Sequence, residues 1–308
     1  MRIIKYCCRV YEKQIEHLEV DNLASLERVC IRKRFFFRFA SDTGEYERNC
    51  SPADDFIRLL KAKKVDVYTF IERSWCCPIV NPSRKWLKAS DNIALATIST
   101  YEEWVTRIGK KTRNMIRKAE KAGVRTQSVE PSSELAEGIW KIYNETPIRQ
   151  ERLFPHYGES LEQVKNMVFG PVNGVYIVAY FEEEIVGFIQ LIFGDQIGVI
   201  SQILALQRHN DKAVNNSLLA KAVEVCAQRK VQWVMYGRIG NHPSLDKFKE
   251  NNGFVKYPLT RYFVVLTWKG RLATVFGLQR ELKDVLPQWL KLRLLPFYKW
   301  FSKRKIEG

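Results

Sequence analysis

The order of apolar runs between residues 93 and 266 constrains the fold of this 308-residue chain more than any other feature. Three strand-like runs follow one another with only short polar turns between them: 175–181, 185–193 and 198–206. Neighbouring strands joined by short turns pair in antiparallel fashion. The sequence therefore predicts a three-stranded antiparallel meander in the second half of the chain.

A long helix is expected directly after the meander. Apolar residues recur every fourth position from Val214 to Cys226, and Asn210 or Asp211 is the predicted cap at its start. Three further elements are predicted: a strand at 232–236, a helix at 244–252 and a last strand ending at Leu266. The whole order is that of a mixed α/β (α+β) domain.

Three helices and a loop are predicted before the meander. Thr100 with Glu103 predicts a capped helix start, and Gly123 predicts its end, so we expect one helix over 100–123. A second helix is predicted from Ser132 or Ser133 to Asn144, and a short one over 160–169. The aromatic and basic segment between them, 146–160, contains prolines and is predicted to be a loop.

These patterns divide the chain into three parts. Residues 1–99 are predicted to form a smaller N-terminal lobe of mixed strand and helix, including a helix over 51–64 and a buried strand that starts at 93. Residues 100–268 form the main domain. Residues 269–308 form a basic amphipathic tail, for which membrane contact through 283–305 and packing against the N-terminal lobe are both open.

The charge of the chain indicates an acidic partner. Fifty Lys and Arg residues against 34 Asp and Glu residues give a formal charge of +16. A strongly positive protein attracts polyanions, among them nucleotide phosphates, tRNA and anionic lipid headgroups. The helix over 100–123 has a dense basic face, which is either a solvated surface or a contact for such a polyanion.

The cysteines and the apolar runs indicate the compartment. The seven cysteines include two adjacent pairs but no CxxC spacing, which favours reduced thiols in the cytoplasm over disulfides or a metal site. No run of residues is long and apolar enough to predict a membrane span. We expect a cytoplasmic protein, with peripheral contact to the inner face of a membrane as an option.

Two strings of residues carry a family resemblance. Residues 110–124 read KKTRNMIRKAEKAGV, a basic helix, and residues 245–254 read LDKFKENNGF, a helix that stops at Gly-Phe. Together with the element order, they resemble GNAT-like acyltransferases, and the first string resembles the linking helix of the Fem-like branch of peptidyltransferases and related acetyltransferases. The resemblance covers about residues 93–266.

This resemblance implies a fold and an activity. The implied fold is a mixed, mainly antiparallel sheet flanked by helices, with the smaller N-terminal α/β lobe beside it. The implied enzyme is an N-acyltransferase that moves an acyl or aminoacyl group to an amine acceptor, such as an amino sugar, an amino acid or a cell-envelope precursor. Acyl-CoA (acetyl-CoA) or aminoacyl-tRNA would be the donor, and no metal is implied.

The donor is expected at the start of the long helix, where backbone amides meet a pyrophosphate in this family. Residues 208–213 occupy the place of the glycine-containing signature, and Asp211 stands where the first glycine is expected. A carboxylate there would repel a pyrophosphate. Fem-like enzymes also lack the glycines and use aminoacyl-tRNA, although the long helical hairpin that they generally carry for tRNA is not found in this sequence. The candidate donor-binding residues are Gln207, Arg208, Lys212, Asn215, Asn216 and Ser217.

The catalytic and acceptor-binding candidates come from the 146–160 loop and from the strands. His156 is a candidate general base because imidazole titrates near neutral pH. Tyr236 and Tyr262 are candidate proton donors to the leaving group, although strand tyrosines also serve as core residues. The candidate substrate-binding residues are Arg149, Arg152, Tyr157 and Gln202. The residues of the loop, His156 included, can equally belong to a solvated basic surface.

Two other classes of protein fit the composition. A noncatalytic RNA-binding protein would use the basic helix and the aromatic loop to hold phosphates and bases. A membrane-surface protein would use the basic tail. The aromatic and glycine motifs typical of RNA-binding modules are not found in the sequence, so we take the acyltransferase as the leading hypothesis.

Overall fold

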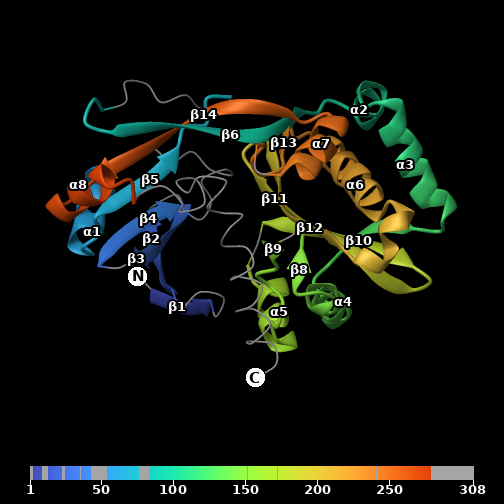
Figure 1. Ribbon diagram of the computed structural model, residues 1–308, viewed down its shortest axis with the longest axis horizontal. Helices are drawn as coiled ribbons and strands as arrows, with labels where there is room; N and C mark the ends of the chain where they lie inside the picture. The colour runs from blue at the N-terminus through green and yellow to red at the C-terminus, as the bar shows by residue number, and fades with distance from the viewer. Residues whose placement is uncertain are drawn as a thin grey trace.

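The computed structural model describes residues 3–8, 13–22, 25–34, 36–42, 54–75, 83–150, 152–171, 173–240 and 242–278. A single twelve-stranded sheet runs through both halves of the chain, in the order β1-β2-β3-β4-β5-β14-β6-β13-β12-β11-β10-β7. Figure 1 shows the sheet as a curved surface with helices at both ends. The predicted mixed, mainly antiparallel sheet flanked by helices is therefore confirmed.

The N-terminal part contributes one end of the sheet. Its first four strands are antiparallel, and helix α1 (Asp54–Ala62) then leads into β5, which runs parallel to β4. The strands are β1 (Ile3–Cys8), β2 (Lys13–Asn22), β3 (Ser25–Arg34), β4 (Phe37–Asp42) and β5 (Val67–Ile71). The described part of the predicted 51–64 helix is shorter by a few residues at each end.

The predicted helix over 100–123 is two helices, α2 (Tyr101–Arg107) and α3 (Lys110–Lys121). Its start is as predicted, because the Thr100 side chain accepts the Glu103 amide. The break falls at Ile108, whose extended backbone, with ψ 147°, turns its side chain into the core. The Arg113 guanidinium donates to the carbonyls that end α2, Val105 and Ile108 among them. Burial of Ile108 therefore outweighs helix continuity here.

The meander and the helices around it lie where the sequence predicts them. Residues 174–205 form three antiparallel strands, and α4 and α5 pack together ahead of them in the chain. The elements are α4 (Ser133–Asn144), α5 (Leu161–Val168), β10 (Gly174–Phe181), β11 (Glu184–Gly194) and β12 (Ile197–Ala205). Strand β7 (Arg125–Val129), which pairs with β10, was not predicted. A two-stranded ladder, β8 (Ile148–Arg149) with β9 (Arg152–Leu153), lies within the predicted loop.

The last elements complete the sheet and cover it. They are the short 3₁₀ helix η1 (Gln207–Lys212), α6 (Val214–Gln228), β13 (Trp233–Met235), α7 (Pro243–Asn251), β14 (Val255–Val265) and α8 (Trp268–Val275). Helix α6 buries nine residues against β10, β11 and β12. This packing produces the largest apolar core of the described chain.

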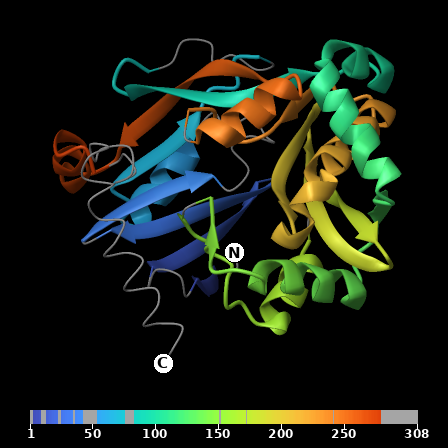
Figure 2. The ribbon, with the colours of Figure 1, turned by 45° about the vertical axis from the view of Figure 1, so that its right-hand side comes forward.

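Two long strands join the two halves. Strand β6 (Leu87–Thr97) pairs with β13 of the second half, and β14 pairs with β5 of the first half. The two also pair with each other over nine residues, from Leu87 with Phe263 to Leu95 with Val255. Each half thus contributes its last strand to the other half, as the crossing of β6 and β14 in Figures 1 and 2 shows. The halves share one continuous sheet.

Candidate functional site

The strands β12 and β13 part from each other at the centre of the second half. They pair in parallel only where Ile197, Gly198 and Val199 face Trp233–Met235. Beyond this point β12 continues to Ala205 beside β11, whereas the chain after β13 turns toward β6 through the Tyr236 amide, which donates to Ala94. The end of β12 from Ile200 onward is therefore unpaired on the side that faces β13.

A chain of side-chain hydrogen bonds runs through Gln202, on this unpaired part of β12. The Tyr143 hydroxyl of α4 donates to Gln202 Oε1 at 2.6 Å. Gln202 Nε2 lies 3.0 Å from His156 Nε2, and His156 Nδ1 lies 2.8 Å from Glu159 Oε1. Since a carboxylate only accepts, Nδ1 carries the imidazole proton and Nε2 keeps its lone pair. This arrangement gives His156 the tautomer of a general base.

Aromatic packing fixes the imidazole in this position. The His156 ring stacks on Tyr143 at 4.5 Å between centroids, and Phe154 lies against both rings. Tyr143 is fully buried, and burial raises its pKa above the ordinary value for a phenol. It therefore stays a protonated hydrogen-bond donor at neutral pH. The His156 side chain is about one-third exposed, so a substrate has access to it.

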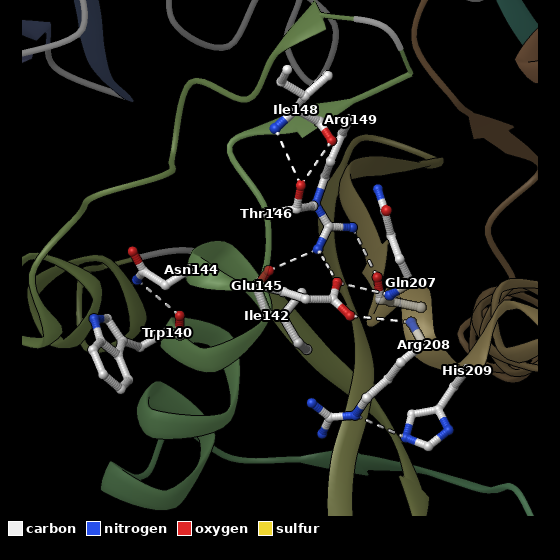
Figure 3. Close-up of polar contacts among 11 residues, drawn as sticks. Trp140, Ile142, Asn144, Glu145, Thr146, Ile148, Arg149, Gln207, Arg208 and His209 are labelled. Carbon is white, nitrogen blue, oxygen red and sulfur yellow. Dashed lines mark hydrogen bonds and ion pairs between the residues drawn. The ribbon is translucent and has the colours of Figure 1, made fainter. Parts of the chain in front are cut away.

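A second cluster lies where β12 leads into residues 207–213, which the sequence predicts to bind the donor and which we call the donor loop. Glu145, at the end of α4, accepts the backbone amides of Gln207 at 2.7 Å and Arg208 at 3.2 Å. Its carboxylate also pairs with Arg149 at 3.1 Å, and Arg149 donates to the Ala205 carbonyl at 2.8 Å. Figure 3 shows this arrangement, in which the carboxylate lies between the guanidinium and the loop amides. Glu145 thus occupies the first two amides of the loop.

The loop itself differs from the prediction. Its residues form the 3₁₀ helix η1, and α6 begins only at Val214, not at Asn210 or Asp211. The reason is the backbone of Ala213, whose φ of +54° is left-handed and interrupts the helix. Asp211 is exposed and pairs with Lys212, so its carboxylate does not cap α6.

The predicted donor-binding residues lie on this loop or on the first turn of α6, in different surroundings. Arg208 pairs with Glu184, and the Lys212 ammonium lies over the Phe181 ring at 4.8 Å. Ser217 is buried in the core, and Asn215 Oδ1 is buried without a partner. Asn216 donates its amide to the Ala213 carbonyl. Positive charge therefore reaches this surface mainly from Arg208 and Lys212.

Of the predicted catalytic and substrate-binding residues, some lie in the two clusters and others do not. Arg149, His156 and Gln202 lie in the two clusters. Tyr262 does not: it packs in the core of the N-terminal part, where its hydroxyl donates to Glu72 at 3.0 Å. Strand β14 pairs with β5, so Tyr262 lies in the N-terminal part, away from the two clusters. The order of elements along the chain does not reveal this pairing.

Tyr236 follows β13 directly, and its ring packs on Phe254 beside the Lys249 ammonium. The backbone of Tyr157 lies in the turn after Phe154, and Arg152 lies on β9.

Three residues of the clusters were missed: Tyr143, Glu145 and Glu159. Tyr143 belongs to the apolar face of α4, so its position in the sequence predicts a core residue and not a site residue. Glu159 follows His156 by three residues in a turn, a spacing that suits an acid–histidine pair and could have drawn attention. A surface hollow between α4 and the β10–β11 turn lies elsewhere and is lined mainly by glutamates. No group of side chains suited to a metal ion occurs among the described residues.

Comparisons with known proteins place these clusters in a family context. Residues 136–254 match the model of the acetyltransferase (GNAT) family, a stretch that runs from α4 to the residue before β14. A comparison with curated proteins gave no match. The matched stretch contains both clusters and the donor loop.

Several solved structures share the fold. FemX aligns over 85% of this chain and 90% of its own, with a TM-score of 0.59 and 9% identity. The C-terminal domain of a protein described as a lysylphosphatidylglycerol synthetase from Agrobacterium fabrum aligns over 87% and 88%, with a TM-score of 0.55 and 13% identity. L-PGS from Bacillus licheniformis aligns over 82% and 84%, with a TM-score of 0.54 and 14% identity.

The resemblance to GNAT-like acyltransferases is confirmed by the family match together with this shared fold. Residues 136–254 thus carry a GNAT-type acetyltransferase domain, and the chain shares its overall fold with FemX.

Proposed function

We propose that the chain transfers an aminoacyl or acyl group from an activated ester to the amine of a small molecule or cell-envelope precursor, at the unpaired end of β12. The observation that carries this proposal is the hydrogen-bonded chain from Glu159 through His156 to Gln202, which lies where β12 has left β13. Direct acyl transfer to an amine requires a base that can accept a proton, and His156 Nε2 has the lone pair for it.

The proposed reaction uses His156 as the general base. An acceptor amine displaces the Gln202 amide from His156 Nε2 and gives this nitrogen its proton as the new C–N bond forms. Glu159 stabilises the resulting imidazolium through the 2.8 Å contact to Nδ1. The C–O or C–S bond of the donor then breaks, and the leaving oxygen or sulfur takes the proton back from His156.

Gln202 is the proposed donor to the developing oxyanion. Its amide nitrogen has two hydrogens, and its carbonyl oxygen is held by the Tyr143 hydroxyl, which fixes the orientation of the side chain. A hydrogen-bond donor fixed in advance stabilises the tetrahedral intermediate without reorganisation during the reaction. Tyr143 is in this account a positioning residue.

The surroundings of the donor loop favour aminoacyl-tRNA over acyl-CoA. Glu145 takes the first two loop amides, and Asp211 adds a second carboxylate where a pyrophosphate would approach. Helix α3 packs beside α6 and has six basic residues and one acidic residue. Such a surface attracts a polyanion without binding a pyrophosphate at the loop.

The acceptor is proposed to be an amine of an amino acid, an amino sugar or an envelope precursor. The protein described as a lysylphosphatidylglycerol synthetase shares this fold, and its name is that of an enzyme which makes an aminoacylated phospholipid. Arg149 is held by Glu145 and by two backbone carbonyls, so we assign it to supporting the donor loop instead of the acceptor. The tail segment 283–305, a candidate for membrane contact, lies outside the described residues.

A product assay tests the proposal. The protein is incubated with charged tRNA or with acetyl-CoA, each with a panel of amines, and amide products are detected by mass. We expect product from charged tRNA, and a loss of at least ~10²-fold in His156→Gln. His242→Gln, with its histidine in the loop before α7, is the matched control and should keep full activity. Salt-sensitive RNA binding with no amide product from either donor would favour the noncatalytic alternative.

A further inference from the structure

Helix α8 is packed with its small residues inward and its large apolar residues outward. Gly270 and Ala273 are buried, and a Cβ on Gly270 would lie 2.1 Å from the Asp66 carbonyl oxygen. Trp268, Val275 and Phe276 are 71%, 75% and 70% exposed. An amphipathic helix of a globular protein ordinarily faces the other way, with its large apolar residues toward the core.

A second exposed aromatic lies at the same end of the molecule. Phe36, at the turn between β3 and β4, is 64% exposed. The neighbouring Arg34 donates to the Leu278 carbonyl, just after α8, at 2.6 Å, and α8 contacts β4. Figure 1 shows α8 at the same end of the molecule as α1 and β4. We call Phe36, Trp268, Leu272, Val275 and Phe276 the apolar end patch.

The two segments that form the apolar end patch are basic. Residues 30–40 and 267–278 contain no Asp or Glu. The basic residues in these two segments are Arg32, Lys33, Arg34, Arg38, Lys269 and Arg271. Lys63 and Lys64 shortly precede Asp66, whose buried carboxylate accepts the Thr267 hydroxyl at the start of α8. An apolar patch with a basic border is complementary to an anionic partner that also has an apolar interior.

We propose that the apolar end patch docks the protein onto an anionic lipid surface. Trp and Phe side chains partition into the interface of a bilayer, and Lys and Arg beside them bind its acidic headgroups. RNA would satisfy the basic border but would not bury Val275 and Leu272. No helix among the described residues is long and apolar enough to cross a membrane, so the contact is peripheral.

Vesicle co-sedimentation of the full chain tests this docking surface. The probes are vesicles of phosphatidylcholine alone and of equimolar phosphatidylcholine and phosphatidylglycerol. We expect binding to the mixed vesicles only, and a loss of about tenfold or more in affinity for Phe276→Ser and for Phe36→Ser, since each removes one inserted side chain. Because both residues are exposed, the variants should unfold at the wild-type temperature.

A matched control comes from the opposite half. Phe169, which follows α5, is 54% exposed, and Phe169→Ser should bind the mixed vesicles as the wild type does. Equal binding by Phe276→Ser and wild type would overturn the proposal and assign any vesicle binding to other residues, such as 279–308. Failure of the wild type to prefer the acidic vesicles would also overturn it. Neither result bears on the acyltransfer reaction, which is assayed separately.

Discussion

At the scale of single residues, Glu145 links Arg149 on β8 to the loop that follows β12. It accepts two loop amides and pairs with Arg149, whose side chain is only 11% exposed. Burial lowers the pKa of Arg149 and the Glu145 charge raises it, with burial the larger effect. The guanidinium nevertheless remains charged at neutral pH. One carboxylate therefore fixes both the backbone of the loop and the position of a buried cation.

We expect Glu145→Gln to lower the free energy of unfolding by about 1–3 kcal/mol, because the buried Arg149 loses its counter-charge. Urea unfolding followed by circular dichroism measures this change. Glu183→Gln is the control, since Glu183 forms an ion pair with Arg125 in which both side chains are more than two-thirds exposed. If Glu183→Gln lowered the free energy of unfolding as much as Glu145→Gln does, burial of the ion pair would not explain the loss of stability.

The residue scale also shows what sequence reasoning could reach. His156 and Gln202 were predicted as site residues, because a histidine in an aromatic loop and a polar residue late in a strand are visible in the sequence. Tyr143 and Glu145 were not, because they differ from core and surface residues only through contacts made after folding. The left-handed Ala213 was likewise invisible, since alanine has no local preference for that conformation.

At the scale of elements, the periodicity of apolar residues predicted the helices and strands that depend on local sequence alone. The meander and helices α4, α5 and α7 have alternating or helical patterns that survive folding, and all were found within a few residues of their predicted places. The break between α2 and α3 was missed because burial of Ile108 decides it. The exchange of β6 and β14 was missed because strand pairing over a long separation leaves no pattern in either strand.

The packing of α6 on β11 gives a prediction at this scale. A Cβ on Gly187 would lie 2.9 Å from Val214 Cγ1 and 3.0 Å from Leu218 Cδ1. Gly187→Ala should lower the free energy of unfolding by about 1–3 kcal/mol through overpacking at the start of α6. The control is Gly109→Ala, which has open space around its Cβ and an ordinary φ of −64°. Equal stability of the two variants in urea would contradict the close approach of α6 to β11.

At the scale of the whole molecule, a buried ion cluster ties the two halves together. Asp91 on β6 accepts from Arg238, after β13, at 2.6 Å and from Arg261 on β14 at 2.8 Å. Burial raises the pKa of Asp91, but the hydrogen bonds and charges of the two arginines outweigh it and hold the pKa below its ordinary value. The cluster lies where β6 and β14 pass between the halves.

This depressed pKa predicts a pH-dependent stability. The contribution of Asp91 is fully present above the unfolded-state pKa of about 4 and is lost as pH falls through the folded-state value. Asp91→Asn should cost about 3 kcal/mol at neutral pH, measured by urea unfolding, and the difference from wild type should shrink in acid. Asp55→Asn, in an exposed pair with Arg58, should cost almost nothing at either pH. A pH-independent difference for Asp91→Asn would contradict the assignment.

The state of His156 tests the proposed chemistry most directly. The chain has four histidines, so nitrogen-detected magnetic resonance of the labelled imidazoles can resolve them, with His156→Gln as the assignment control. We predict that His156 carries its proton on Nδ1, and that its Nε2 signal shifts when a non-hydrolysable aminoacyl-adenosine amide or acetyl-CoA binds. A His156 protonated on Nε2, or signals unmoved at saturating concentrations of both ligands, would contradict acyl transfer at the parted strands.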